Sequence, residues 1–228
     1  MTVNARKFAL VPGAGGMAWY WHRVVAELTA AGREAIAIDL PGADEQAGLA
    51  EYRDIVLKSA TGGDVLVAQS LGGFTAARVC ERITPAALVF VNAMIPQPGE
   101  TAGQWGENVG STAARLAAAD AGGYTRDFDE QVYFLHDVPP EALAGGSEPR
   151  PEADRIFGDP CAFTRWPDIP THALIGADDR LFPLDLQQRI ARDRLGLEAD
   201  VIPGGHLVAL SNPKGVAEYL LAVADSVR

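Results

Sequence analysis

Short apolar runs alternate with amphipathic helical segments along much of the chain, and this alternation constrains the fold more than any other feature. Strands that alternate with helices form a parallel sheet, because each helix returns the chain to the same end of the sheet. The expected strands are 8–11, 35–40, 65–67, 87–91, 172–175 and 199–202. The expected helices are 19–31, 49–60, 71–82, 184–195 and 214–227. We therefore expect an α/β domain with about six strands, mostly parallel and covered by helices on both faces.

The alternation stops between residues 95 and 170. This stretch is rich in proline and also contains many aromatic residues, which supply enough apolar surface to favour an ordered structure. A loop of this length is uncommon in a compact domain unless it carries structure or function. We expect a helical lid at 95–170, inserted after the fourth strand, and a core made of 1–94 and 171–228. A partly disordered insertion is the alternative.

Charge and composition exclude several classes of protein. The 228 residues are enough for one domain with a full hydrophobic core. The net charge of −11 argues against nucleic acid and anionic membranes as partners. We find neither an export signal nor an apolar stretch that could span a bilayer, and Cys80 and Cys161 lack metal-ligand spacing. We expect a cytoplasmic monomer or homodimer without a metal site.

A serine occupies the junction between one predicted strand and the helix that follows it. The residues after the strand 65–67 are Ala-Gln-Ser-Leu-Gly at 68–72. A sharp turn at this place exposes the serine hydroxyl, as in a nucleophile elbow, whose usual pattern is Gly-x-Ser-x-Gly. Ala68 replaces the first glycine, and we expect a modest backbone adjustment to accommodate its methyl group. Ser70 is the candidate nucleophile.

A serine hydroxyl is a weak nucleophile and needs a base, which is usually a histidine oriented by a carboxylate. Three histidines follow Ser70 in the sequence. His206 comes after the last predicted strand, behind two glycines that allow a tight turn. His172 lies at the start of a strand, the wrong end of a parallel sheet for catalysis. His136 lies in the predicted lid. The pattern favours His206 as the base, and it leaves Asp178 and Asp179, behind the preceding strand, as candidates for the acid.

At this point the chain resembles the α/β-hydrolase superfamily. The fifth parallel strand of that superfamily often runs into a Gly-x-x-Asp-x-x-x-Pro turn, which Gly176, Asp179 and Pro183 match here. The resemblance implies that Asp179 is the acid, with Asp178 as the fallback. No carboxylate stands at the other common place, because the residues 91–95 after the fourth strand contain none.

Residues 8–21, which end in Trp-Tyr-Trp at the start of a predicted helix, carry a second resemblance. They are similar to the small-esterase branch that includes plant methyl esterases and hydroxynitrile lyases. Attack on an ester carbonyl creates an oxyanion, which backbone N–H groups must stabilise. One donor is expected from Leu71, directly after the nucleophile, and the resemblance implies Ala14 as the other. The family usually has His-Gly-x in that loop, and Pro12 departs from this pattern. Phosphate binding by the glycine-rich loop is a weaker alternative, since the loop lacks the Lys-Ser/Thr of a P-loop.

Two further positions bear on substrate choice. Gln69 stands where many relatives have histidine, and it either contacts substrate or only packs. The lyases of this branch typically have a lysine directly after the catalytic histidine, and Leu207 occupies that position here. The aromatic residues of the lid imply an apolar substrate of modest size. The candidate substrate contacts are Gln69, His136, Phe163 and Trp166.

These observations predict a serine hydrolase that cleaves a small ester through an acyl-enzyme on Ser70. His206 would act as base and then as acid, Asp179 would orient it, and the N–H groups of Ala14 and Leu71 would hold the oxyanion. This chemistry requires no metal and no organic cofactor. The alternatives are a carbon–carbon lyase, a cofactor-free oxygenase or perhydrolase on the same fold, and a binding protein that has lost turnover.

Overall fold

The centre of the molecule is a six-stranded sheet with the order β2-β1-β3-β4-β5-β6, in which all neighbouring strands are parallel. The computed structural model describes residues 6–146 and 148–227. The strands are β1 (Phe8–Val11), β2 (Ala35–Ala37), β3 (Val65–Gln69), β4 (Ala87–Val91), β5 (Thr171–Gly176) and β6 (Asp200–Ile202). The predicted parallel sheet with about six strands is therefore confirmed.

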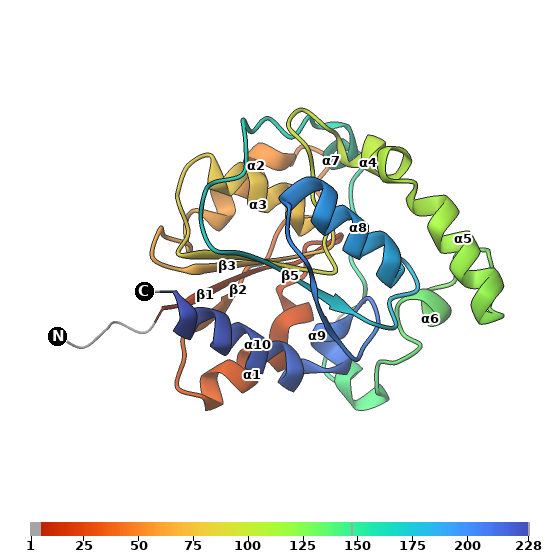
Figure 1. Cartoon of the computed structure of the whole chain (residues 1–228). Coiled ribbons are helices and arrows are strands. Elements are labelled where there is room, and N and C mark those ends of the chain that lie inside the picture. The colour runs from red at the N-terminus through yellow and green to blue at the C-terminus, as the bar shows by residue number, and fades with distance from the viewer. Residues whose placement is uncertain (1–5, 147, 228) are drawn as a thin grey trace.

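Helices cover both faces of the sheet (Figure 1). One face carries α1 (His22–Ala30), α9 (Val208–Ser211) and α10 (Pro213–Ser226), and a 3-10 turn, η1 (Ala18–Trp21), precedes α1. The opposite face carries α2 (Leu49–Val56), α3 (Gly72–Cys80) and α8 (Leu184–Leu195). Successive strand residues point to opposite faces, so each strand contributes to two hydrophobic layers. Leu66 and Ala68 pack in the layer under α2 and α3, whereas Val65 and Val67 pack in the layer under α1 and α10.

The chain between β4 and β5 contains several short helices rather than further strands. They are α4 (Ala102–Val109), α5 (Ser111–Gly122), α6 (Glu130–Tyr133), the 3-10 turn η2 (Pro140–Leu143) and α7 (Arg155–Gly158). Within the described residues, no helix is long and apolar enough to cross a membrane. That the segment 95–170 acts as a lid stays a prediction.

Two elements end at least three residues earlier than the sequence predicts. The second strand was expected to reach residue 40 but ends at Ala37. The backbone groups of Leu40 bond to Arg150 and to the loop after β1 rather than to a neighbouring strand. The helix expected over 49–60 ends as α2 at Val56, and its last residues form tight turns that hydrogen-bond back to Val56. Neither difference moves the carboxyl ends of β3, β5 and β6, where the candidate catalytic residues lie.

Candidate active site

Ser70 lies on a strained turn directly after β3. Its φ angle is +49°, a conformation that non-glycine residues rarely adopt. The turn is held on both sides, because the N–H groups of Gly73 and Met94 both donate to the Ser70 carbonyl oxygen, at 3.1 and 2.9 Å. A strained backbone persists only where the surroundings over-determine it, and such residues cluster at active sites. The turn thus has the geometry of a nucleophile elbow.

His206 bridges Ser70 and Asp179. Its Nδ1 lies 2.8 Å from Oδ2 of Asp179, and its Nε2 lies 3.1 Å from Oγ of Ser70. The ring is almost fully buried, with 2% of the residue exposed. An ionised carboxylate can only accept, so the hydrogen-bond pattern assigns the ring proton to Nδ1. The lone pair of Nε2 then faces the serine hydroxyl, as proton abstraction requires.

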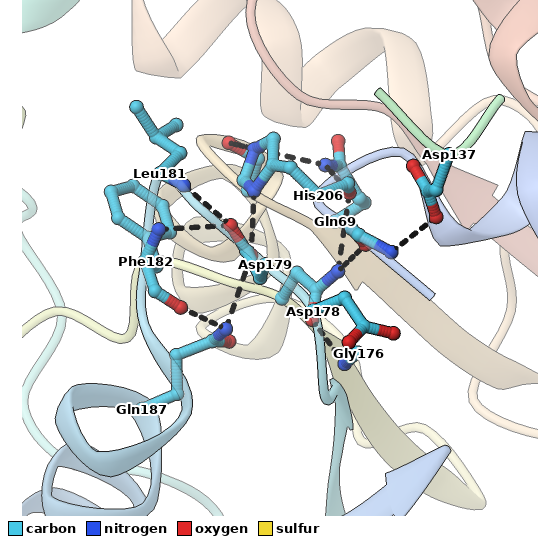
Figure 2. A network of polar contacts seen from close by, with 12 residues as sticks. Gln69, Asp137, Gly176, Asp178, Asp179, Leu181, Phe182, Gln187 and His206 are labelled. Carbon is cyan, nitrogen blue, oxygen red and sulfur yellow. Dashed lines mark hydrogen bonds and ion pairs between the residues drawn. The ribbon is translucent and has the colours of Figure 1, made fainter. Parts of the chain in front are cut away.

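The Asp179 carboxylate is fixed by donors from the chain that follows it (Figure 2). Its Oδ1 accepts hydrogen bonds from the N–H groups of Leu181 and Phe182, both at 2.9 Å. Its Oδ2 accepts a bond from Nε2 of Gln187 at 3.1 Å, in addition to the bond from His206. With all these donors converging on it, the carboxylate has one orientation toward the imidazole.

Asp178, the fallback for the acid, points elsewhere. Its Oδ2 accepts from the N–H of Gly204 at 3.2 Å, and its own N–H donates to the Gly204 carbonyl at 2.9 Å. Asp178 therefore secures the loop that carries His206 and does not touch the imidazole. Its neighbour Arg180 donates to the carbonyl of Val132 and lies over the Tyr124 ring.

The two predicted oxyanion donors stand beside the nucleophile. Leu71 is the residue between Ser70 and α3, and Ala14 belongs to the loop after β1, which pairs with β3 up to Val11 and Ala68. Neither the Ala14 nor the Leu71 N–H donates a hydrogen bond to the part of the chain that the structure describes. Both groups are thus available to a ligand, and the start of α3 adds a positive dipole end at Leu71.

A cavity of about 520 Å³ opens beside these residues. The loop 12–15 and Gln69 form the side next to Ser70, and the remaining wall is largely apolar. Its large apolar side chains are Met17, Trp19, Tyr20, Phe134, Leu135, Leu143, Leu207 and Leu210. Its charged residues are Glu130, Glu148, Arg150 and Glu152. A concave, mainly apolar space with a few polar groups is typical of a small-molecule site.

Three predicted substrate contacts need comment. Phe163 and Trp166 line neither this cavity nor the one beside Asp179; Trp166 packs on Phe163 and on Phe90 in the core, and a substrate contact by either residue stays a prediction. Apolar surface in that part of the chain is used to cover the sheet.

His136 lines a separate cavity of about 410 Å³, which Asp179 also lines, and its Nε2 lies 3.0 Å from the Asp178 carbonyl. Burial lowers the pKa of His136, with the charge of Arg180 acting in the same direction.

A comparison with known protein families shows to which family the chain belongs. A family model described as "Alpha/beta hydrolase family" matches residues 8–219, nearly the whole chain. The chain belongs to the alpha/beta hydrolase family.

Individual relatives match part of this chain. The rice protein "Probable esterase PIR7A" (Oryza sativa subsp. indica) is 40% identical over 117 residues, which are 45% of this chain and 44% of that protein. "Methylesterase 7" of Arabidopsis thaliana is 38% identical over 109 residues, 41% of this chain and 42% of that protein. The chain thus spans less than half the length of these curated relatives.

Solved structures resemble this chain over almost its full length. The methylesterase MES16 from Arabidopsis superimposes with a TM-score of 0.75 at 21% identity, over 96% of this chain and 99% of that one. A pyrethroid hydrolase from Sphingobium faniae JZ-2 gives a TM-score of 0.75 at 22% identity, over 97% and 98%. At such identities the likeness concerns the fold.

Two aromatic rings pack against the imidazole of His206. The Phe134 ring stacks on His206 at 5.2 Å between centroids and 22° between planes. Phe182 meets the same ring edge-on at 5.1 Å and 88°. Phe134 also lines the cavity, so it separates the histidine from solvent on the substrate side. The only sequence signal for this role was the general abundance of aromatic residues between β4 and β5.

Gln69 approaches the histidine from the strand side. Its Nε2 lies 3.4 Å from Nε2 of His206 and 3.4 Å from the His206 carbonyl oxygen. These long contacts place an amide next to both the base and the cavity (Figure 2). Gln69 thus lies beside the base, and its contact with substrate stays a prediction. Among the described residues, no cluster of three histidine, cysteine or acidic side chains could hold a metal ion.

Proposed function

We propose that the protein is a serine esterase that hydrolyses small, uncharged esters through an acyl-enzyme. The observation that carries the proposal is the unbroken chain of hydrogen bonds from Asp179 through His206 to the Ser70 hydroxyl. Membership of the alpha/beta hydrolase family and relatives named esterase and methylesterase support it.

The geometry supports the following course. As Ser70 Oγ attacks the ester carbonyl carbon, its proton passes to Nε2 of His206, and Asp179 stabilises the resulting imidazolium. The carbonyl oxygen becomes an oxyanion that accepts hydrogen bonds from the N–H groups of Ala14 and Leu71. When the carbon–oxygen bond to the alcohol breaks, His206 returns the proton to the leaving oxygen. Water then attacks the acyl-enzyme by the same steps in reverse order, which releases a carboxylic acid and regenerates Ser70.

The size, apolar walls and charges of the cavity indicate which class of substrate it could bind. Its apolar walls and its volume of about 520 Å³ fit an ester with an aromatic or medium-length aliphatic group. Carboxylates outnumber cations in the lining, and Arg150, the cation, is paired with Asp39. An anionic substrate would find no free positive partner there, whereas a methyl ester of an apolar acid would match the walls. We further propose that the segment 95–170, which contributes Phe134 and Leu143, is the lid of this site.

Kinetics of single variants test the proposal. Wild-type protein should hydrolyse p-nitrophenyl butyrate and become labelled on Ser70 by a fluorophosphonate, and Ser70→Ala should do neither. His206→Ala should lower kcat by about 10⁴-fold or more, as losses of triad members do elsewhere. Labelling of Ser70→Ala at the wild-type rate would rule out Ser70 as the nucleophile.

The two neighbouring aspartates provide a matched pair for the acid. Asp179→Asn should lower kcat by about 10⁴-fold, because an amide at this place can stabilise the wrong histidine tautomer. Asp178→Asn changes the same charge one residue away, at a side chain that bonds only the Gly204 backbone, and should cost less than about tenfold. The reverse ranking would show that Asp178 is the acid.

A further inference from the structure

The loop after β1, which carries Ala14, is held from outside by a short stretch of the segment between β4 and β5. We call residues 150–153 the strap. Three strap residues bond to the neighbouring chain: Arg150 Nη1 donates to the Leu40 carbonyl at 2.5 Å, Ala153 N–H donates to the Gly42 carbonyl at 2.7 Å, and Glu152 contacts the loop itself. The strap therefore runs along the loop after β1 and along the chain that follows β2.

Glu152 makes the direct connection to the loop. Its Oε2 accepts a hydrogen bond from the Gly15 N–H at 2.7 Å, and its Oε1 accepts one from the Tyr52 hydroxyl of α2 at 2.5 Å. The carboxylate thus joins the loop to a helix of the core. Burial raises the pKa of Glu152, and the bonds from Tyr52 and Gly15 and the charge of Arg150 oppose that rise. Hydrogen bonds to a charged acceptor are stronger than neutral ones, so this connection is a firm one.

The backbone at Gly15 has little freedom to move or to accept another residue. Its φ angle is +82°, which favours glycine, and a β-carbon there would collide with the Arg150 carbonyl oxygen. The Gly15 N–H is adjacent in the chain to the Ala14 residue, so the bond to Glu152 turns the Ala14–Gly15 peptide in one direction. The loop has no side chain that could do this from within, since Pro12, Gly13, Ala14 and Gly15 carry no polar side-chain atom.

We propose that Glu152 is a positioning residue, which aims the Ala14 N–H at the developing oxyanion by holding the Gly15 N–H from the strap. This inference rests on the proposed function, because it assigns the hold on one of that site's two donors. It also explains how the loop keeps its shape with Pro12 at the position where the small-esterase branch usually has histidine. The strap belongs to the same segment as the proposed lid, so the oxyanion donor is complete only while that segment is docked.

The experiment separates the hydrogen bond from the charge. Glu152→Leu removes both acceptors, whereas Glu152→Gln keeps one oxygen for the Gly15 N–H and can donate its amide to the Tyr52 oxygen. Glu141→Gln is the matched control, because Glu141 belongs to the same segment, is exposed, lies outside the cavity lining, and no hydrogen bond from the described residues reaches its side chain. We would measure kcat and KM for p-nitrophenyl butyrate, and the inhibition constant of an alkyl boronic acid, whose tetrahedral adduct on Ser70 places a negative oxygen at the oxyanion position.

Glu152→Leu should lower kcat by about ten- to a hundredfold, below the 10²–10³ lost when an oxyanion donor is removed outright. Boronic acid binding should weaken by a similar factor, while KM changes by less than about threefold, because the interaction forms only in the transition state. Glu152→Gln and Glu141→Gln should stay within about threefold of wild type in all three quantities.

Three results would overturn the proposal: an effect of Glu152→Leu no larger than that of Glu141→Gln, an effect on KM alone, or an equal loss in Glu152→Gln. If Glu152→Leu does not fold, Tyr52→Phe removes only the second anchor of the carboxylate and should still lower kcat at constant KM; an unchanged kcat would count against the role. A wild-type protein that neither turns over esters nor binds the boronic acid would refute the proposed function itself, a failure distinct from any of these.

Discussion

Asn92 holds the loop that carries the histidine, although it takes no part in the hydrogen-bond chain to Ser70. It follows β4, has a φ angle of +45° and is fully buried. Its Nδ2 donates to the carbonyls of Gly205 and His206 at 2.9 and 3.1 Å, and its Oδ1 accepts from the Gly176 N–H at 2.8 Å. One side chain thus ties the ends of β4 and β5 to the histidine loop.

Replacing Asn92 should destabilise the protein in a graded way. Asn92→Ala leaves the Gly205 carbonyl and the Gly176 N–H without the Asn92 side chain, and leaves the His206 carbonyl with only the long contact from Gln69. Alanine also tolerates left-handed backbone less well than asparagine, so we expect the free energy of unfolding to fall by about 2–4 kcal/mol. Asn92→Gly loses the same hydrogen bonds, but glycine adopts left-handed backbone without strain. Its loss in the free energy of unfolding should therefore be about 1 kcal/mol smaller. Urea unfolding of the two variants measures both values. A loss below about 0.5 kcal/mol in Asn92→Ala would mean that water replaces the side chain at no cost.

At the scale of residues, the sequence predicts those that follow strands and misses those that act across the chain. Ser70, Asp179 and His206 come together because each stands just after the carboxyl end of a parallel strand, and strand ends can be located from the apolar pattern. Asn92, Gln187 and Glu152 could not be found in this way, because nothing in the local pattern shows which distant backbone group a polar side chain will meet. The core packing of Phe163 and Trp166 was not predictable for the same reason.

The helix α3 shows how closely the elements around Ser70 pack. The two glycines at the start of the helix lie against backbone atoms of other segments. A β-carbon on Gly72 would meet the Pro12 carbonyl oxygen, and a β-carbon on Gly73 would collide with the Met94 carbonyl oxygen. Ala68, in contrast, replaces a glycine of the usual pattern without disturbance, because β3 keeps its pairing with β1 and β4 through this residue. Close approach is therefore required on the helix side of the elbow and not on the strand side.

A methyl group on Gly73 should move α3 away from the strands. Gly73→Ala meets a backbone atom that cannot rotate away, so we expect a loss of about 1–3 kcal/mol in the free energy of unfolding. The displaced Leu71 N–H should also lower kcat by about tenfold or more. Gly158→Ala is the matched control, since no atom lies within 4 Å of a β-carbon there, and it should leave both quantities unchanged. Equal behaviour of the two variants in thermal unfolding and ester turnover would contradict this packing argument.

The elements themselves were predictable because their signals are local. Every expected strand exists, and the differences are confined to ends, as at β2 and α2. The end of β2 depends on Arg150, more than a hundred residues away in the chain, which binds the Leu40 carbonyl. Such a contact has no counterpart in the periodicity of the strand.

For the molecule as a whole, the arrangement of the segment between β4 and β5 depends on long-range polar contacts that composition does not reveal. Glu100 lies near the start of that segment and forms a two-pronged ion pair with Arg194 of α8; the Nη2–Oε1 distance is 2.9 Å, and the side chains are 4% and 6% exposed. Asn108 and the Gln97 N–H donate to the same carboxylate, at 2.7 and 3.0 Å. The segment is thus fastened to the core at its beginning by this buried pair and near its end by the strap.

Breaking this pair should destabilise the whole protein. Arg194→Met leaves the Glu100 carboxylate buried without its cation, and removal of one partner of a buried pair costs about 3–5 kcal/mol. The exposed pair of Arg192 with Glu198, at 3.4 Å, provides the control: Arg192→Met should cost less than about 1 kcal/mol. Urea unfolding at pH 7 compares the two.

The same pair predicts the direction of the pH dependence. Burial alone would raise the pKa of Glu100, but the bonds from Arg194, Asn108 and Gln97 outweigh it and hold the pKa below its ordinary value of 4.5. The folded state then binds fewer protons than the unfolded state, so the pair contributes its full stability above pH 4.5 and loses it as the pH falls through the folded pKa. In Arg194→Met the buried carboxylate becomes easier to protonate, so acid relieves its cost. The difference in unfolding free energy between wild type and Arg194→Met should therefore be largest at neutral pH and shrink toward pH 4. A difference that grows on acidification would show that Glu100 is not the group that Arg194 stabilises.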